Sequence, residues 1–455
     1  MDEVEVIVVG MGPGGEDVAE RLAEAGLVVV GVDGELVGGE CPYWGCIPSK
    51  MMIRAADLLA EGRRVPGMAG SSQVVPDWAP VAARIRQEAT DDWDDAVAVK
   101  RFEEKGGRFV RGWGRLDGPR RVVVGDQVFE ATRAVVIGAG TRSWAPPIAG
   151  LADTPYWTNR QAIETKTVPA SLAILGGGAI GSELAQVFRR FGSEVTVLEA
   201  GPRLLGPEEP EAASLLADVF RSEGIDVRVG VTIEAVSHDG DGFTLSLEGG
   251  DSVVAERLLV AAGRRPDLDG LNVRSIGLDP EARAIPVDDH LRVEGVEDTW
   301  ALGDITGKGA FTHISMYQAN VVVDDILGRT VVPADYRAVP RVTFTDPEIG
   351  SVGLSEHDAR AQGMSVRVGH YDIPSSTRGW IHKAGNQGFI KLVEDEERGV
   401  LVGATSAGPW GGEVLGLLAL AVHAQVPTAT LAHMIYAYPT FHRAVENAVK
   451  DLSGQ

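Results

Sequence analysis

The sequence predicts an α/β protein with two Rossmann-like dinucleotide-binding domains and a third, α+β domain at its C-terminal end. Three observations predict this fold class. Two glycine-rich turns each lie between a predicted strand and a predicted helix, an acidic residue ends the strand after each helix, and the pattern changes to antiparallel strands from Arg341 onward. The length of 455 residues suffices for two or three domains of about 100–200 residues each.

The first dinucleotide-binding unit begins with the apolar run VEVIVV at residues 4–9, which is typical of a buried strand. The turn GMGPGG follows, a helix is predicted from about Gly14 to Ala25, and a second apolar run, 27–32, leads to Asp33. In such a unit the pyrophosphate binds at the helix N-terminus and the acidic residue binds a ribose hydroxyl. The predicted ligand-binding residues are Gly10, Gly12, Gly15 and Asp33.

The second unit repeats this pattern, with a strand at 171–175, the turn GGGAIG, a helix to about Phe191 and a strand at 194–198 that leads to Glu199. A carboxylate at that strand end binds the adenosine ribose and repels a 2′-phosphate, so Glu199 favours NADH; the nearby Arg203 leaves NADPH open. The other predicted contacts are Gly176, Gly178 and Gly181. Two dinucleotide sites in one chain favour electron transfer from a nicotinamide to a flavin.

The remaining elements are predicted from hydrophobic patterning. Helices are expected at 47–59 and 81–105, joined by a loop at 65–80 that is rich in Pro, Gly and Ser. Strands are expected at 108–113, 121–124, 134–137, 258–260 and 299–304. The third domain is expected to contain strands at 341–344, 388–394 and 401–407, and helices at 413–424 and 440–452.

The charge balance excludes several classes of partner. The net charge of −23 argues against nucleic acid and against an anionic membrane surface, because binding to either depends on Lys and Arg. No apolar stretch approaches the roughly 20 residues of a membrane span, and the acidic N-terminus does not resemble a signal peptide. We therefore expect a cytoplasmic protein.

Cysteine usage points to redox chemistry. The chain has two cysteines, Cys41 and Cys46, close together in a C-x4-C arrangement. A structural disulfide is unfavourable in the cytoplasm. A metal site would need further ligands, and the chain has neither a second cysteine pair nor an H-x-x-x-H motif. The pair therefore predicts thiol–disulfide chemistry, and no metal site is expected.

The segment GGECPYWGCIPSK at 38–50 resembles the redox-active segment of the FAD-dependent pyridine nucleotide–disulfide oxidoreductases, whose members include dihydrolipoamide dehydrogenase, mercuric reductase and glutathione reductase. The similarity continues through GAG at 138–140, AAGRRPD at 261–267, TWALGD at 299–304 and PRVTFTDPEIGSVG at 340–353. It implies a homodimer with an FAD-binding domain at 1–150 and 271–335, an NAD(P)-binding domain at 151–270 and a dimerisation domain at 336–455.

The resemblance also implies roles for single residues. Cys46 would face the flavin as the charge-transfer thiolate, and Cys41 would be the interchange thiol that meets substrate. Lys50 and Glu183 match an ion pair close to flavin N5, while Asp33 would bind the adenosine ribose of FAD and Asp304 a ribityl hydroxyl. Further cofactor contacts are expected at Gly39, Gly114, Gly138, Gly140, Gly263 and Gly303.

The C-terminal segment departs from the family pattern. Disulfide-reducing members carry His-Pro-Thr-x-x-Glu, in which the His is the acid/base; here Tyr438 replaces the His and Arg443 the Glu. Tyr438 is one candidate for a substitute role. His442 is the other, if Thr440 caps a helix that carries His442 and Glu446 on one face, although an exposed helical His is the simpler interpretation.

The expected function is therefore electron transfer from NAD(P)H through FAD to the Cys41–Cys46 disulfide, and on to a small-thiol or lipoamide-like disulfide. The alternative is an NAD(P)H:acceptor reductase in which the flavin reduces a quinone, a dye or a metal ion. Delivery of a soft metal ion is disfavoured, because the chain lacks the C-terminal cysteine pair of mercuric reductases. A docking role without catalysis is disfavoured by the full set of cofactor motifs.

Overall fold

The structure is a computed structural model that describes residues 2–454 and separates into two compact units. The first unit comprises the chain up to Ser49, Ala83–Trp144 and Arg264–Tyr336. The second comprises Lys50–Ala82, Ala145–Gly263 and the chain from Arg337 onward. The three-domain division expected from the sequence stays a prediction.

The first unit is built around a seven-stranded sheet in the order β3-β2-β1-β6-β5-β4, with β16 also paired to β6. Strands β1, β2, β3 and β16 run parallel to their neighbours, whereas β4, β5 and β6 form an antiparallel extension. The strands are β1 (Asp2–Val9), β2 (Val29–Asp33), β3 (Arg108–Arg111), β4 (Gly114–Leu116), β5 (Arg121–Val124), β6 (Gln127–Ile137) and β16 (Thr299–Ala301).

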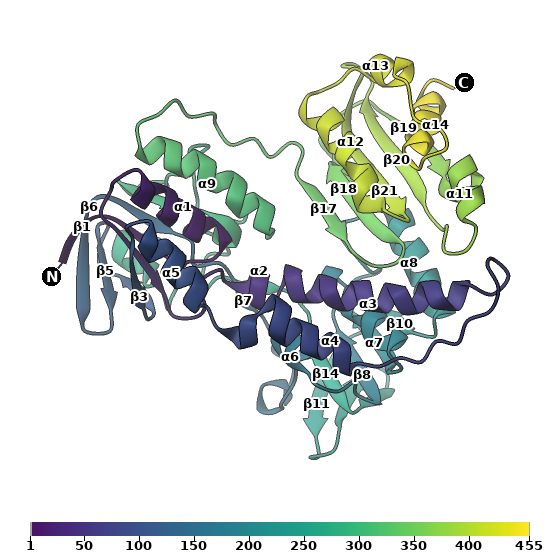
Figure 1. The fold of residues 1–455 in the computed structure, drawn as a ribbon, viewed down its shortest axis with the longest axis horizontal. Helices are drawn as coiled ribbons and strands as arrows, with labels where there is room; N and C mark the ends of the chain where they lie inside the picture. The colour runs from purple at the N-terminus through teal and green to yellow at the C-terminus, as the bar shows by residue number, and fades with distance from the viewer. Residues whose placement is uncertain (1, 455) are drawn as a thin grey trace. The chain divides into compact units, whose positions relative to one another are not determined.

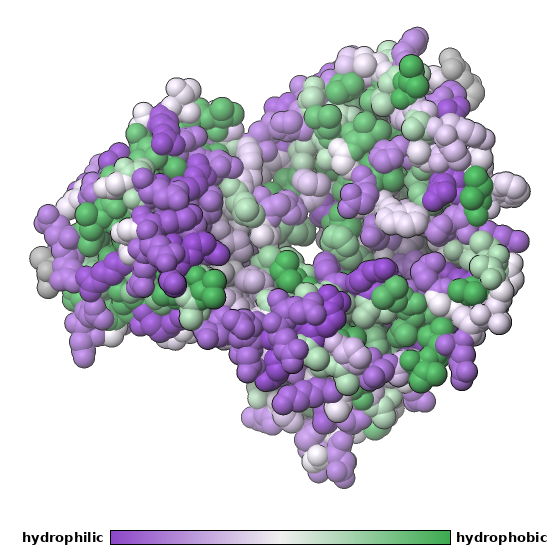
Figure 2. All heavy atoms as spheres, in the orientation of Figure 1, coloured by the Kyte–Doolittle hydropathy of each residue, from purple (hydrophilic) through white to green (hydrophobic). Residues whose placement is uncertain are grey.

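Helices α1 (Pro13–Glu24) and α9 (Thr312–Ile326) pack side by side on this sheet, as Figure 1 shows. Helix α5 (Ala96–Glu104) packs against α1 and β3. The space-filling view in Figure 2 shows hydrophilic side chains gathered over α1 and α5, where Arg101 and Lys105 form ion pairs with Glu20. Short elements complete the unit: α2 (Glu40–Tyr43), β7 (Arg142–Ser143), β15 (Arg264–Arg265), and the 3-10 turns at Val273–Ile276 and Gly303–Thr306.

The prediction of a single helix over 81–105 is wrong. This segment consists of α4 (Ala79–Arg84), a π-helical turn (Ile85–Ala89), a 3-10 turn (Asp91–Trp93) and α5. Asp91, Asp92 and Trp93 all have left-handed backbone angles, with φ between 47° and 59°, which α-helical geometry forbids. The Asp94 carboxylate then accepts the amide of Ala96 at 2.8 Å, so a new helix starts there.

The second unit contains a four-stranded parallel sheet in the order β10-β9-β8-β14 and a three-stranded antiparallel sheet, β11-β12-β13. Its strands are β8 (Ser171–Leu175), β9 (Glu194–Glu199), β10 (Asp226–Val229), β11 (Ile233–His238), β12 (Phe243–Leu247), β13 (Ser252–Ala255) and β14 (Arg257–Val260). Its helices are α3 (Cys46–Arg64, from Lys50 onward), α6 (Asn159–Glu164), α7 (Ala179–Arg190) and α8 (Pro210–Ser222), with a 3-10 turn at Leu151–Asp153.

The C-terminal part of the second unit is a five-stranded antiparallel sheet, as the alternating pattern predicted. Its order is β17-β18-β21-β20-β19, with β17 (Pro340–Thr343), β18 (Glu348–Gly353), β19 (Val366–Asp372), β20 (Phe389–Asp395) and β21 (Val400–Gly408). Helices α12 (Gly411–His423) and α14 (His442–Leu452) cover it and bury the largest apolar cluster of this part. Smaller elements are α10 (Glu356–Ala361), a 3-10 turn (Ile373–Ser375), α11 (Thr377–His382) and α13 (Thr428–His433).

Candidate dinucleotide and redox sites

The first glycine turn leaves space where a phosphate would bind. Gly10 has a φ of +96°, and a Cβ there would overlap the carbonyl of Gly138. A Cβ on Gly15 would overlap the carbonyl of Gly10, whereas one on Gly12 would meet nothing within 4 Å. Gly12 is also the N-cap of α1 and provides no side-chain cap, so the first amides of the helix remain available to an anion. This cradle fits a dinucleotide pyrophosphate.

Asp33 lies at the end of β2 with its carboxylate held by two backbone amides. One oxygen accepts from Met11 and the other from Glu35, both at 2.7 Å. Burial raises the pKa of Asp33, and the two amide hydrogen bonds oppose that rise. Each carboxylate oxygen retains a second lone pair for a ligand hydroxyl.

Asp304 follows β16 at the same edge of the sheet. Its carboxylate accepts a hydrogen bond of 2.7 Å from the Thr141 hydroxyl. Arg264 donates to the Thr141 carbonyl at 2.6 Å and to its hydroxyl oxygen at 3.0 Å, and its guanidinium lies 3.6 Å from the Glu40 carboxylate. Gly303, with a φ of +78°, precedes Asp304 and donates its amide to Gln318. Asp304 is thus oriented by a network that starts next to Cys41.

The second glycine turn repeats the geometry of the first. Gly176 has a φ of +109°, and a Cβ there would overlap the carbonyl of Ala261; a Cβ on Gly181 would overlap that of Gly176. A Cβ on Gly178 would meet nothing within 4 Å, and Gly178 caps α7 without a side-chain hydrogen bond. The two glycine turns, one in each unit, therefore have equivalent backbone geometry.

Glu199 ends β9 in the way that Asp33 ends β2. Its carboxylate accepts the amides of Gly177 and Gly201, both at 2.6 Å. Arg203 donates to the carbonyl of Gly206 at 2.8 Å. The Arg203 guanidinium is thus hydrogen-bonded within its own loop.

The two cysteines lie on successive helices, in α2 and at the start of α3, both within the first unit. Cys41 is in α2 and is half-buried, whereas Cys46 is exposed and is the first residue of α3. The Sγ of Cys46 lies 3.5 Å from the Oγ1 of Thr312. The pKa of the Cys41 thiol is raised by its hydrogen bond with the Cys46 thiol and then by burial, while Thr312 opposes the rise. The structure therefore brings both thiols and the Thr312 hydroxyl together.

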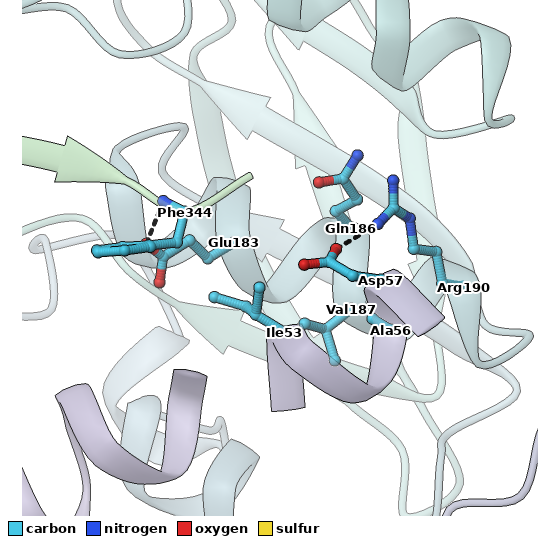
Figure 3. A pocket seen from close by; sticks show the side chains of 8 residues that line it. All are labelled: Ile53, Ala56, Asp57, Glu183, Gln186, Val187, Arg190 and Phe344. Carbon is cyan, nitrogen blue, oxygen red and sulfur yellow. Dashed lines mark hydrogen bonds and ion pairs between the residues drawn. The ribbon is translucent and has the colours of Figure 1, made fainter. Parts of the chain in front are cut away.

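Lys50 and Glu183 form the ion pair that the sequence predicted. The Nζ of Lys50 lies 2.6 Å from the Oε2 of Glu183, whose side chain is 7% exposed. The other oxygen of Glu183 accepts the amide of Phe344 at 2.8 Å. Figure 3 shows Glu183 and Phe344 at one end of a narrow pocket and Asp57 and Arg190 at the other.

The C-terminal candidates are not brought together as a dyad. Glu446 pairs with Arg443 at 3.1 Å and with Lys450 at 2.8 Å, rather than with His442. The helix begins at His442 with Phe441 as its N-cap, so the prediction that Thr440 caps it is wrong; the Thr440 hydroxyl donates instead to the carbonyl of Ala437. Tyr438 is exposed, donates to Thr377 at 3.4 Å and carries the Arg443 guanidinium over its ring.

The remaining predicted glycines differ in their surroundings. Gly39 caps α2 with a φ of +67°, and a Cβ there would lie 2.9 Å from the Cα of Gly12, so it borders the first glycine turn. Gly140 and Gly263 have positive φ values and open space around them. Gly114 differs, because a Cβ there would meet the side chains of Val9 and Val32. This position packs on the core.

Sequence reasoning missed Thr141, Arg264, Thr312 and Phe344 as parts of the sites. Arg264 stands inside the matched motif AAGRRPD and Phe344 inside PRVTFTDPEIGSVG, so the motifs carried a signal for these two. Thr312 carries no such signal, because its contact with Cys46 joins positions far apart in the chain. Within residues 2–454, no cluster of three or more His, Cys, Asp or Glu side chains could hold a metal ion. No helix of the described chain is both long and apolar enough to span a bilayer.

Known protein families and individual proteins resemble this chain over most of its length. The family model described as pyridine nucleotide-disulphide oxidoreductase matches residues 4–319, and the model of the dimerisation domain of the same family matches residues 339–449. A dihydrolipoyl dehydrogenase of Halobacterium salinarum is 32% identical, over 99% of this chain and 96% of that protein. A mercuric reductase of Acidithiobacillus ferrooxidans is 30% identical, over 98% of this chain and 82% of that protein.

A solved structure is similar over the same extent. The Cu(II) complex of the HOCl-induced flavoprotein disulfide reductase RclA from Escherichia coli superimposes with a TM-score of 0.86 at 25% identity, over 99% of each chain.

Proposed function

Because the chain belongs to the pyridine nucleotide-disulphide oxidoreductase family, we propose that it passes electrons from NAD(P)H through FAD to the Cys41–Cys46 pair and on to a disulfide substrate. The observation that carries the proposal is the placement of the two thiols within hydrogen-bond reach of each other, with Cys46 at the first position of α3. The glycine turns that precede α1 and α7 fit the pyrophosphates of the two dinucleotides. Bound FAD supplies the two-electron relay between the nicotinamide and the disulfide.

Cys46 is proposed as the thiol that remains next to the cofactor. At the first position of α3, the free amides and the positive end of the helix dipole favour a thiolate over a thiol. The Thr312 hydroxyl, 3.5 Å from the sulfur, can donate a hydrogen bond to that thiolate. The helix N-terminus favours negative charge at Cys46, whereas the pKa of Cys41 is raised although Thr312 opposes the rise.

Cys41 is proposed as the thiol that exchanges with substrate. Its thiolate attacks one sulfur of the substrate disulfide, so a mixed disulfide forms and the first substrate thiolate leaves. The Cys46 thiolate then attacks the Cys41 sulfur, which re-forms the Cys41–Cys46 disulfide and releases the second substrate thiolate. Two electrons reach the substrate in each cycle, and solvent supplies the two protons that the product thiols take up.

We propose NADH as the preferred donor. Both oxygens of Glu199 are held by backbone amides, which fixes a carboxylate where a 2′-phosphate would have to lie. Arg203 is engaged by the carbonyls of its own loop, so a phosphate would have to compete for it. Both features support discrimination against NADPH.

We also propose that the chain acts as a homodimer, which the matched dimerisation domain supports. The cytoplasmic location stays a prediction from the sequence.

A second candidate is an NAD(P)H:acceptor reductase in which a quinone, dye or metal ion takes electrons without thiol exchange. The observation that favours it is Tyr438, an exposed phenol where disulfide-reducing members carry an acid/base imidazole. A phenol with a pKa near 10 exchanges protons poorly at neutral pH. A mercuric reductase is also among the relatives of this chain.

Steady-state turnover of two cysteine variants tests the two functions. Cys41→Ser and Cys46→Ser are assayed with NADH, first with a small-thiol disulfide and then with a quinone. The proposal expects disulfide reduction to fall by more than about 100-fold in both variants, because the exchange needs both thiols. Disulfide turnover that survives both substitutions would disprove it, and unchanged quinone turnover would identify a separate, thiol-independent activity.

A further inference from the structure

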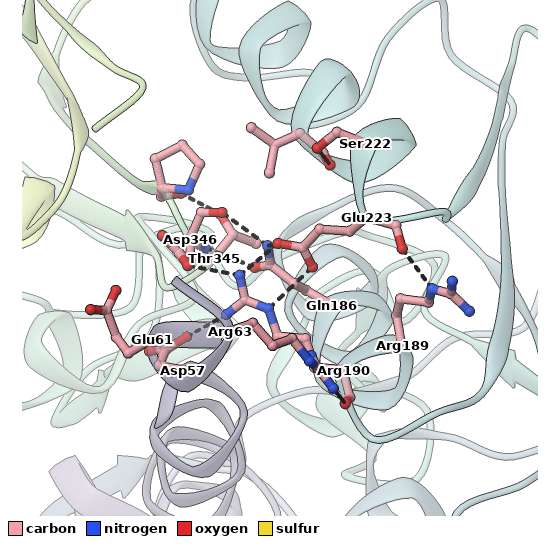
Figure 4. A network of polar contacts seen from close by, with 12 residues as sticks. Asp57, Glu61, Arg63, Gln186, Arg189, Arg190, Ser222, Glu223, Thr345 and Asp346 are labelled. Carbon is pink, nitrogen blue, oxygen red and sulfur yellow. Dashed lines mark hydrogen bonds and ion pairs between the residues drawn. The ribbon is translucent and has the colours of Figure 1, made fainter. Parts of the chain in front are cut away.

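One face of α7 holds the loop that follows β17. Glu183, Gln186 and Arg190 are spaced i, i+3 and i+7, so they lie along one side of the helix. Glu183 accepts the amide of Phe344 at 2.8 Å. Gln186 accepts the amide of Asp346 at 2.7 Å and donates to its carbonyl at 2.9 Å. Figure 4 shows Gln186 and Arg190 converging on Asp346.

One face of α3 binds the same residues from the other side. Lys50, Asp57 and Arg64 are each two helical turns apart on this face. Lys50 pairs with Glu183 at 2.6 Å, and Asp57 pairs with Arg190 at 2.7 Å. Arg64 and Arg190 both bind the carboxylate of Asp346, at 2.6 and 2.7 Å. The loop Phe344–Asp346 is thus clamped by charged and amide groups from two helices.

Phe344 contacts both members of the Lys50–Glu183 pair. Its backbone amide holds Glu183, and its ring lies under the Lys50 ammonium, with 4.6 Å between the Nζ and the ring centroid. The Glu183 side chain is buried, but that of Lys50 is 34% exposed. The ring therefore contacts the more exposed member of the pair.

We propose that Phe344 is a positioning residue for Lys50: its ring fixes the direction of the ammonium, and the Asp346 clamp fixes the ring. The proposal rests on the proposed function and on the family resemblance, which implies that Lys50 and Glu183 form an ion pair beside the flavin.

The physical need for such a residue follows from the lysine side chain. Lysine has a flexible four-carbon stem, and a partly exposed ion pair restricts it weakly. A cation over an aromatic face gains a further attraction that depends on direction, so it favours one rotamer.

The test is the rate constant of flavin reduction by NADH, measured by anaerobic stopped flow on the FAD-loaded enzyme. Phe344→Leu removes the ring but keeps the backbone amide that holds Glu183, and we expect reduction to slow by about three- to tenfold, the range that a cation–π contact supports. Phe344→Tyr retains the ring and should keep the wild-type rate. Phe344→Met, which fills similar space without a ring, repeats the test if the leucine variant does not fold.

A double-mutant cycle with Lys50→Met separates positioning from general damage. If Phe344 acts through Lys50, Phe344→Leu slows the wild-type enzyme but has little further effect once Lys50 is replaced. Equal slowing in both backgrounds would overturn the proposal, as would an unchanged rate in Phe344→Leu or in Lys50→Met alone.

Phe109→Leu is the matched control. Phe109 also lies under a cation at 4.6 Å, the Arg111 guanidinium, but makes no contact with Lys50 or Glu183. Its substitution should leave the rate constant unchanged, and slowing comparable to that in Phe344→Leu would count against the proposal. FAD content and melting temperature are recorded for each variant as a readout of folding. Failure of the cysteine test leaves this measurement intact, because it follows hydride transfer before any thiol exchange.

Discussion

At the scale of single residues, Asp33 and Glu199 have the same arrangement of hydrogen bonds with backbone amides. Each carboxylate ends a parallel strand, and each accepts one amide from the glycine turn and one from the residue two positions ahead. The amides orient the carboxylate before a ligand arrives, so the proposed binding of a ribose would cost little reorganisation. The sequence predicted both residues, because motif spacing alone specifies a strand end beside a glycine turn.

Glu199→Gln tests the proposed preference for NADH. The substitution removes the negative charge but keeps an oxygen that can accept one backbone amide, so the strand end should remain intact. We expect the ratio of kcat/KM for NADPH to that for NADH to rise by about tenfold, equivalent to about 1.4 kcal/mol. Steady-state kinetics with both donors measures this ratio. A ratio equal to that of the wild type would show that Glu199 does not select the donor.

Tyr438→His tests whether this position reaches the exchanging thiol. An imidazole has an ordinary pKa near 6.5, so a histidine at this position would introduce a group that titrates near neutral pH. We expect the pH profile of kcat/KM for the disulfide to gain an inflection between about pH 6 and 7. Arg443, whose guanidinium lies over the Tyr438 ring in the wild type, is not substituted in this variant. A profile that matches the wild type would place the exchange site elsewhere.

At the scale of elements, local pattern predicted the strands next to the glycine turns but missed β10 to β13, β18 and β19. Strand β8 was predicted with its observed bounds and β9 to within one residue, because each is an apolar run next to a glycine-containing turn. The break at Asp91–Trp93 was missed, since these residues adopt left-handed angles that no local propensity indicates. Phe344 and Thr312 were missed because their partners, Lys50 and Cys46, are brought to them only by the fold.

Asp57 should make the contact between α3 and α7 sensitive to pH. Burial outweighs the attraction of Arg190 and raises the pKa of Asp57 from 3.8 to about 6. A raised carboxyl pKa stabilises the fold below the unfolded value, and this contribution is lost as the pH rises through 6. The Asp57→Asn variant has no titratable carboxyl at this position, so it does not lose this contribution to stability as the pH rises.

We therefore expect the stability of Asp57→Asn relative to the wild type to rise by about 1–2 kcal/mol between pH 4 and pH 7, because the shift at 1.36 kcal/mol per pKa unit is reduced by solvent screening of the partly exposed carboxylate. Free energies of unfolding from urea titrations at the two pH values provide the measurement. Asp218→Asn is the control, because that carboxylate is 77% exposed and should give no such trend. A constant difference between Asp57→Asn and the wild type would contradict the expectation.

At the scale of the whole molecule, each unit carries its own glycine turn, and the segments outside the C-terminal sheet leave large apolar side chains exposed. Trp380 is 73% exposed and Ile435 is 96% exposed, both in the part that matches the dimerisation domain. Composition could not predict such an interface, because it depends on which apolar side chains the fold leaves on the surface. The family resemblance supplied that expectation.

Ile435→Glu tests the proposed dimer. We expect the wild type to sediment at about twice the chain mass of 48.2 kDa, and the variant to dissociate at a protein concentration at least about tenfold higher, because a buried charge would oppose association. Analytical ultracentrifugation over a dilution series measures both. Val254→Glu, at an exposed apolar position outside the matched dimerisation domain, is the control. A wild type that is monomeric throughout would refute the proposed homodimer.

In the proposed function Cys46 faces the cofactor and Cys41 faces the substrate. Anaerobic reduction of the FAD-loaded enzyme by NADH, followed by absorbance spectroscopy, distinguishes these two roles. We expect a long-wavelength thiolate–flavin charge-transfer band in the wild type and in Cys41→Ser, and none in Cys46→Ser. A band that survives in Cys46→Ser but is lost in Cys41→Ser would contradict these roles.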